Sequence, residues 1–254
     1  MIVTTPQERK DLHAAGIILS SILEDLSAQV REGTSAAALD LFAESAIRTH
    51  GATPAFLGYT PADAPGPYPA ALCVSINDEI VHGLPTEHKI VRKGDIVKLD
   101  LGLSYNGVFV DAARSVCAGS CDARGRELVA ATVEALRGGI AAAKAGGTTE
   151  DIGAAIGRVA RKYKLAVVHE LGGHSLGRTP HEPPFVPNVG REGGGDVLKE
   201  GLVLAIEPIF AEKSGEMFLA PDGWTYKTRD RSRAAQTEAT IIVGKDSADI
   251  LTPF

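Results

Sequence analysis

The sequence is poor in aromatic residues, in sulfur and in excess positive charge. Aromatic side chains make up 5% of its 254 residues, and it has three cysteines, two methionines and one tryptophan. An odd, small number of cysteines does not build a disulfide framework, which excludes a small disulfide-rich secreted fold. The net charge of −6 argues against general electrostatic binding to nucleic acid or to an anionic membrane surface, and we expect no specific nucleic acid as a partner.

Long apolar segments are also missing. The longest, near residues 14–23, is interrupted by serines and ends at Glu24, so it is too short to cross a bilayer. The first eleven residues contain no basic segment followed by an apolar one, and we therefore expect no signal peptide. With 44% hydrophobic and 23% charged residues, the composition is that of a globular protein. A reducing cytosol, hence a cytoplasmic location, is the expected compartment.

Capping residues and apolar spacing predict two pairs of helices. Thr5 is followed by proline and glutamate in the order of a capping box, and Thr148 caps the last helix in a similar way. Thr34 or Ser35 caps the second helix. The predicted helices cover residues 5–26, 34–51, 123–145 and 148–160.

Each helix pair is followed by sequence typical of strands. β-Branched content and alternation predict strands at residues 71–76, 96–104, 108–116, 166–170, 201–209 and 238–243. Proline and glycine mark residues 60–69 and 179–195 as loops. The helix pairs share a turn, a capping threonine and an amphipathic helix, which indicates a duplication. We therefore predict one α+β domain over residues 1–254, with two related halves at about 1–117 and 118–254 and with helices outside a mostly antiparallel sheet.

A predicted hairpin brings two aspartates together. Asn106-Gly107 between two strand segments is a strong signal for a two-residue turn, which pairs Gly102 with Asp111 and places Asp100 on the same face. The two aspartates are then diagonal neighbours, with Cα atoms about 7–8 Å apart. Carboxylates buried in apolar strands need a positive partner. Lys98 on the same face is one alternative, and a divalent metal ion is the other.

Three further residues favour the metal. Glu207 ends a buried strand, Glu238 opens another, and His174 lies among glycines that allow close approach. Four carboxylates and one imidazole suit Mn²⁺, Fe²⁺, Co²⁺ or Zn²⁺, and four negative charges fit two ions about 3.5–4 Å apart better than one. The sequence contains no HExxH or CxxC motif, which leaves single-zinc protease and zinc-finger interpretations without support.

Histidines and cysteines near these residues allow two interpretations each. His82 follows a predicted strand and His181 follows His174 by seven residues; each is either a site residue or a partly exposed loop residue. Cys73 is either part of a soft pocket wall or an ordinary buried thiol. We expect the remaining cysteines, Cys117 and Cys121, to be free thiols.

Several motifs resemble those of one enzyme family. The segments TPQERKDLHAAG, SINDEIVHGLP, GDIVKLDLG, GGHSLGR, HEPPFVPN, LAIEP and DGWTYKTRDRSRAAQTEATI together extend over nearly the whole chain. The sequence closely resembles type I methionine aminopeptidases. This resemblance implies the pita-bread fold, a pseudo-twofold antiparallel sheet with two pairs of outer helices, and a monomer.

The resemblance also implies the roles of individual residues. Asp100, Asp111, His174, Glu207 and Glu238 match the ligands of two metal ions. His82 and His181 match histidines that contact substrate and assist proton transfer, and Glu207 is also implied as a proton shuttle. The positions that match the lining of the methionine pocket are Tyr59, Tyr68, Cys73 and Trp224.

The implied activity is removal of the initiator methionine from nascent chains whose second residue is small and uncharged, by attack of metal-activated hydroxide on the methionine carbonyl. The sequence departs from the family pattern at a few positions near the site, and we expect these departures to affect the rate and the side-chain selectivity but not the reaction. They are Val110 and Ala112 beside the second aspartate, Ser175, Pro180, Ala239 and about six extra residues within 60–69.

Several rival interpretations stand beside this one. A prolidase or Xaa-Pro aminopeptidase would share the five ligands, and a non-catalytic relative would be expected to lose some of them. A serine or cysteine hydrolase would need a nucleophile motif such as GxSxG, which the sequence lacks. The alternating bases Lys227, Arg229, Arg231 and Arg233 are typical of a solvated face, the alternative being a transient ribosome contact.

Overall fold

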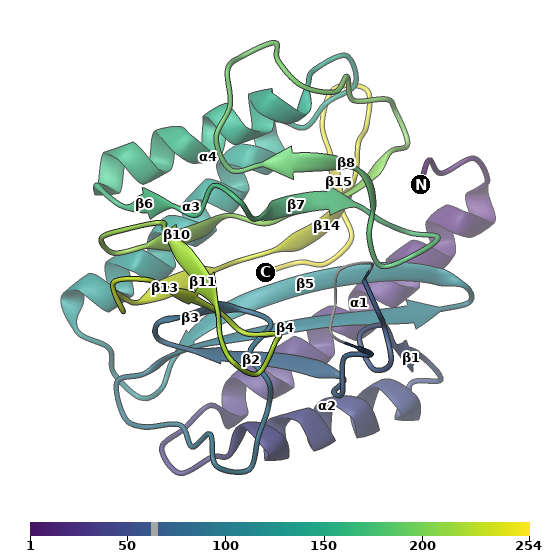
Figure 1. Ribbon diagram of the computed structural model, residues 1–254. Coiled ribbons are helices and arrows are strands. Elements are labelled where there is room, and N and C mark those ends of the chain that lie inside the picture. The colour runs from purple at the N-terminus through teal and green to yellow at the C-terminus, as the bar shows by residue number, and fades with distance from the viewer. Residues whose placement is uncertain (62–65) are drawn as a thin grey trace.

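Two helix pairs flank a set of antiparallel strands in the computed structural model, which describes residues 1–61 and 66–254 (Figure 1). Figure 1 shows the purple pair in the lower half of the view and the teal pair in the upper half, with strands between them. The helices are α1 (Pro6–Gln29), α2 (Ala36–Thr49), α3 (Ala123–Ala142) and α4 (Thr149–Tyr163). All four predicted helices are confirmed.

The caps explain where the helices begin. The Thr5 hydroxyl accepts a hydrogen bond from the Glu8 amide, and the Glu8 carboxylate accepts one from the Thr5 amide. Thr148 and Asp151 form the same reciprocal pair at α4. Ser35 caps α2. Each reciprocal pair satisfies two backbone groups that would otherwise lack a partner.

The strands form one four-stranded sheet, one five-stranded sheet and two three-stranded sheets. The four-stranded sheet contains β1 (Thr53–Pro54), β2 (Leu72–Ile76), β4 (Ile96–Tyr105) and β5 (Val108–Cys117). The five-stranded sheet contains β7 (Gly172–Ser175), β8 (Glu182–Pro187), β9 (Val203–Ile206), β14 (Ala239–Ile242) and β15 (Asp249–Ile250). The small sheets contain β3 (Glu79–Val81), β11 (Met217–Leu219) and β12 (Tyr226–Thr228), and β6 (Ala166–Val167), β10 (Ile209–Ala211) and β13 (Ala234–Gln236).

The hairpin of β4 and β5 has the predicted register. Tyr105 pairs with Val108 and Gly102 pairs with Asp111 across the Asn106-Gly107 turn. Both turn residues have positive φ, the backbone that Asn-Gly turns favour. This register carries Asp100 and Asp111 on one face of the pair.

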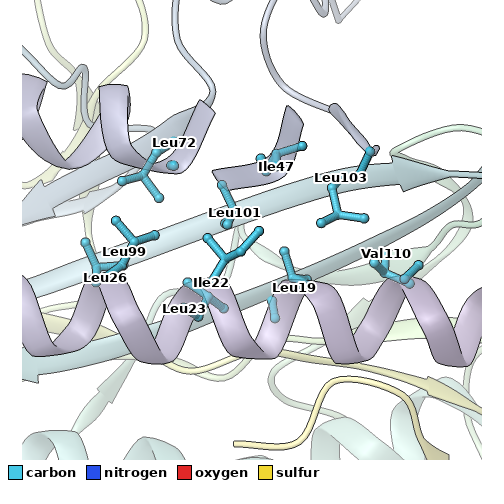
Figure 2. Packing of buried hydrophobic residues seen from close by; sticks show 14 of the residues in the cluster. Leu19, Ile22, Leu23, Leu26, Ile47, Leu72, Leu99, Leu101, Leu103 and Val110 are labelled. Atoms are coloured by element: carbon cyan, nitrogen blue, oxygen red, sulfur yellow. The ribbon is translucent and has the colours of Figure 1, made fainter. Parts of the chain in front are cut away.

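The other face of this hairpin packs on α1 and α2. Figure 2 shows Leu19, Ile22, Leu23 and Leu26 of α1 against leucines of β4, with Ile47 and Leu72 beside them. Burying a side chain of this size stabilises the folded state by about 1.5–3 kcal/mol. Residues at alternate positions of β4 therefore serve two purposes, because one face forms core and the other carries charged groups.

Several short strands, among them β3, β7 and β11 to β13, were not predicted, and two predicted segments differ in kind. The predicted loop 179–195 contains β8, which pairs with β7 on one side. The predicted strand 201–209 is divided into β9 and β10, because Pro208 has no amide hydrogen to continue the ladder. Part of the predicted 60–69 insertion lies outside the described residues. The division into halves near residue 117 stays a prediction.

The expectation of free thiols at Cys117 and Cys121 is wrong, because the structure joins them in a disulfide. A turn through Ala118, Gly119 and Ser120 brings the two Cα atoms to 5.5 Å, which is within the range that a disulfide spans. Cys73 is free and buried. Among the described helices, none combines the length and apolar character needed to cross a membrane.

Candidate functional site

All eleven residues that the sequence analysis assigned to a site line one cavity of about 340 Å³. They come from eight strands or strand ends and from loops, and they are separated by up to about 180 positions in the chain. Further lining is mostly apolar or aromatic, including Phe56 and Phe185. The fold therefore brings residues that lie far apart in the sequence into one cavity.

Four carboxylates form an acidic cluster, in which Asp100, Asp111 and Glu238 are buried and Glu207 is half-buried. Asp100 and Asp111 lie on β4 and β5, Glu207 lies between β9 and β10, and Glu238 precedes β14. The backbone of Glu238 pairs with that of Ala113. The Thr240 hydroxyl also bonds both the amide and the carbonyl of Asp111, at 2.9 and 2.7 Å. The four-stranded and five-stranded sheets thus meet at the cluster.

Ligand-type atoms gather in two groups within the cavity. One group joins Asp100, Glu207 and Glu238, and the other joins Asp111, His174 and His181; within each group the atoms lie within 4.8 Å of one another. The Nδ1 atom of His174 lies 3.0 Å from the Ser175 carbonyl oxygen. A hydrogen bond there leaves the other ring nitrogen, Nε2, as a ligand atom, and this nitrogen lies 4.0 Å from Glu238 Oε1.

Burial raises the pKa of every member of the acidic cluster, and repulsion between carboxylates adds to the rise for Asp111, Glu207 and Glu238. Burial raises the pKa of Asp100 to about 7. Burial, followed by the neighbouring Asp100 charge, holds the pKa of Asp111 and of Glu207 well above the usual range. Burial and the nearby Asp111 do the same for Glu238. The electrostatic cost of placing these carboxylates together can thus be lowered by binding protons or by binding cations.

Lys98 does not neutralise the aspartates, which corrects that alternative. Its ammonium donates to the carbonyl oxygens of Asn77 and Ala234, at 2.9 and 3.0 Å. The described residues that line the cavity include no lysine and no arginine.

The donor set fits divalent cations. Asp100 Oδ1 and Asp111 Oδ1 are buried without a hydrogen-bond partner among residues 1–61 and 66–254. Unpartnered carboxylate oxygens are costly to bury, and a cation would satisfy them. Oxygen-rich groups with imidazole nitrogen at hand suit Mn²⁺, Fe²⁺, Co²⁺ or Zn²⁺.

One side of the cavity is a histidine–aromatic wall, which we define as Tyr59, Tyr68, His82, His181 and Trp224. The His181 ring stacks on Tyr59 with centroids 5.3 Å apart and lies 4.3 Å from the His174 ring. His82 follows β3 with a φ of 55°, an uncommon backbone for a residue with a Cβ. Burial and the nearby His181 lower the pKa of His82 to about 4.

The remaining wall residues form an apolar recess. Tyr68 and Trp224 meet edge to face at 5.0 Å, and Cys73 and Phe56 pack beside them. Phe56 occupies the space over Gly102, where an added Cβ would lie 2.8 Å from its ring. The glycine that the hairpin places between the two aspartates therefore admits an aromatic side chain.

Sequence reasoning missed some of the site. Phe56 and Phe185 line the cavity, and Gln236 contacts two of the carboxylates behind it. Gln236 precedes Glu238 by two residues, a spacing that places side chains on one face of an extended strand. That spacing could have identified Gln236, whereas nothing near Phe56 in the sequence marks it.

Known proteins resemble the chain over its full length. It matches the model of metallopeptidase family M24 over residues 10–245. It is similar to a methionine aminopeptidase of Aquifex aeolicus, with 40% identity over 248 residues that cover 97% of this chain and 96% of that protein.

Solved structures give the same result. The crystal structure of a methionine aminopeptidase from Thermotoga maritima has a TM-score of 0.94 and 36% identity, and the match covers 100% of both chains. A prolidase from Pyrococcus furiosus has a TM-score of 0.77 with 22% identity and covers 100% of this chain and 66% of that one, a likeness of fold alone. The predicted pita-bread fold is confirmed.

Proposed function

Because the chain belongs to metallopeptidase family M24 and, within it, to the methionine aminopeptidases, we propose that it removes the N-terminal methionine from nascent polypeptides. Its substrates would have a small, uncharged second residue. The observation that carries the proposal is the convergence of five ligand-type residues and two further histidines on one cavity beside an apolar recess.

We infer that Asp100, Asp111, His174, Glu207 and Glu238 hold two divalent cations, drawn from Co²⁺, Mn²⁺, Fe²⁺ and Zn²⁺. The unpartnered buried oxygens of Asp100 and Asp111 support this inference. When bound, such cations supply Lewis-acid chemistry, namely activation of water near neutral pH and polarisation of a peptide carbonyl.

The side chains of the cavity would move protons during hydrolysis. Glu207 has two carboxylate oxygens at the cavity, so it could take a proton from the attacking water and pass it to the leaving amide nitrogen. The lowered pKa of His82 keeps its ring neutral at pH 7, with one nitrogen to donate and one to accept. His82 and His181 would then stabilise the negative charge that develops on the carbonyl oxygen.

The apolar recess would bind the methionine side chain. Tyr68, Cys73 and Trp224 offer aromatic edges and a sulfur atom, which suit a polarisable thioether, and Tyr59 closes the side next to His181. The Cys73 thiol is uncharged at neutral pH because burial raises its pKa well above the ordinary value.

A panel of Met-X tripeptides tests the proposal. Enzyme reconstituted with Mn²⁺ or Co²⁺ should release methionine from Met-Ala-Ser and should leave Ala-Pro-Ala, a prolidase-type substrate, intact. Asp111→Asn removes one ligand and should lower kcat/KM by more than the roughly 10–100-fold typical of an outer-shell partner. Cleavage of Ala-Pro-Ala alone would identify an Xaa-Pro enzyme, and no turnover with metal bound would favour a binding protein.

Location and partners stay predictions. Nascent chains are made in the cytoplasm, so we place the enzyme there. Carboxylates pair with Lys227, Arg229 and Arg233, which supports a solvated face over a transient ribosome contact. Salt-dependent ribosome pelleting and size-exclusion chromatography would test the contact and the expected monomer.

A further inference from the structure

Gln236 bridges two members of the acidic cluster from behind the cavity. Its Nε2 lies 2.6 Å from Glu207 Oε1 and 3.3 Å from Asp100 Oδ2. The residue is 0% exposed and it ends β13. Since an amide nitrogen carries two hydrogens, both of its donors are directed at carboxylates.

The chemistry of these contacts fixes the orientation of the amide. In the reverse orientation, the amide oxygen would lie against carboxylate oxygens, and acceptor would face acceptor. In the orientation observed, Oε1 is buried without a partner. The protein thus leaves one acceptor unsatisfied in order to place two donors on Glu207 and Asp100, a cost that a purely structural glutamine would have no reason to carry.

The backbone of Gln236 is held independently of its side chain. The Ser115 hydroxyl accepts from the Gln236 amide at 3.0 Å and donates to its carbonyl at 2.7 Å. Ile209 of β10 pairs with Gln236 in the ladder. The amide therefore projects from a fixed point that touches β5 and β10, and its position does not depend on the carboxylates.

We propose that Gln236 is a positioning residue that orients Asp100 and Glu207 for cation binding. The inference rests on the proposed function, since it concerns the same metal-binding residues. One oxygen of each carboxylate is held by the amide, and the second oxygen stays available as a ligand. Free rotation of both carboxylates would otherwise have to be lost when a cation binds, which weakens affinity.

The bridge also places donors on the negative charge of the cluster. Two N–H groups of one amide are directed at oxygens of Asp100 and Glu207, which lie 3.3 and 2.6 Å from the amide nitrogen. Hydrogen bonds to charged acceptors are stronger than those between neutral groups, so the bridge fixes both carboxylates firmly. The same two bonds link Asp100 from the N-terminal part of the chain to Glu207 from the C-terminal part.

Metal titration of the full-length chain, stripped with chelator, tests the role of Gln236. Gln236→Met keeps the length and volume of the side chain and removes both donors. We expect its affinity for Mn²⁺ to fall by about 10–100-fold, with an altered visible absorption spectrum of the Co²⁺-loaded protein and an unchanged far-ultraviolet circular dichroism spectrum. Gln236→Asn, which shortens the reach of the amide, should show the same changes to a smaller degree and replaces the first variant if that one does not fold.

Ser115→Ala is the matched control, because it removes the hydroxyl that contacts the Gln236 backbone, while the ladder with Ile209 and the side-chain amide stay in place. Its Mn²⁺ affinity and Co²⁺ spectrum should stay close to those of the wild-type protein. Unchanged Mn²⁺ affinity in the Gln236 variants would overturn the positioning role, as would an equal loss in Ser115→Ala. A wild-type chain that binds neither ion would instead refute the proposed function, so the two failures are distinguishable.

Discussion

The acidic cluster and the histidine–aromatic wall share one cavity, yet the chain builds them differently. Members of the cluster lie in or next to paired strands, and Asp100, Asp111 and Glu238 are between 2% and 7% exposed. Wall residues lie outside regular ladders: His82 follows β3 at positive φ, His181 precedes β8, and Trp224 lies in the turn before β12. Groups that repel one another need a rigid scaffold, whereas groups that contact substrate can be placed on the loops that the scaffold holds.

Among substitutions that leave the acidic cluster intact, replacing His82 should lower kcat most. We expect His82→Ala to lower kcat by about 10²–10⁴-fold, the usual contribution of a group that assists proton transfer. Bound metal, measured by elemental analysis, should not change, because His82 is not in either group of ligand-type atoms. Loss of metal from this variant would contradict the distinction between cluster and wall, because the histidine–aromatic wall would then also hold the metal.

The metal-free cluster should make stability depend on pH. The carboxylates titrate near pH 4 when unfolded. Burial raises the folded pKa of Asp100 to about 7 and holds the pKa of the other three well above the usual range. Folded protein thus binds more protons than unfolded protein above about pH 4, so stability is full below that pH. It should fall as the pH rises towards 7, by up to about 1.4 kcal/mol per pH unit for each group.

Urea denaturation of chelator-treated protein at several pH values would measure this slope. Saturating Mn²⁺ should flatten it, because a cation replaces the protons. Asp100→Asn in the metal-free state should reduce it, as one charged form is removed. A slope that is the same with and without metal would show that the carboxylates do not govern stability.

Lys98 lies on the same strand as Asp100 and should make stability depend on pH in the opposite direction, by a smaller amount. Burial lowers its pKa from 10.5 to about 7. Between these values the unfolded chain holds one more proton than the folded chain, so this lysine makes stability increase as the pH rises from 7 towards 10.5. Lys98→Met should remove a slope of at most about 1.4 kcal/mol per pH unit from the denaturation data. Identical slopes in variant and wild type would show that burial does not neutralise this amine.

The sequence predicted elements whose cause is local. Capping boxes at Thr5 and Thr148 and the Asn106-Gly107 turn act over a few residues, and their outcomes match the prediction. Elements that form only by pairing with segments far away in the sequence were missed or were predicted as loops. β8 has little strand character in its own sequence, and it forms because β7 provides a ladder. The loops predicted to carry only connections therefore carry part of the sheet.

The site shows the same division. Residue types and spacing identified the five ligand-type residues and made His82, His181 and Cys73 candidates, since charged groups in apolar strands are visible in a sequence. The resemblance to methionine aminopeptidases supplied the remaining pocket residues, Tyr59, Tyr68 and Trp224. The contacts of Lys98 and Gln236 were not visible, because both depend on which strand lies opposite. The sequence by itself determined the kinds of atom that meet in the cavity and the register of β4 with β5. Only the tertiary structure decided which buried donor faces which acceptor, because hydrogen bonds require positions fixed to within about half an ångström and a sequence specifies positions only along the chain.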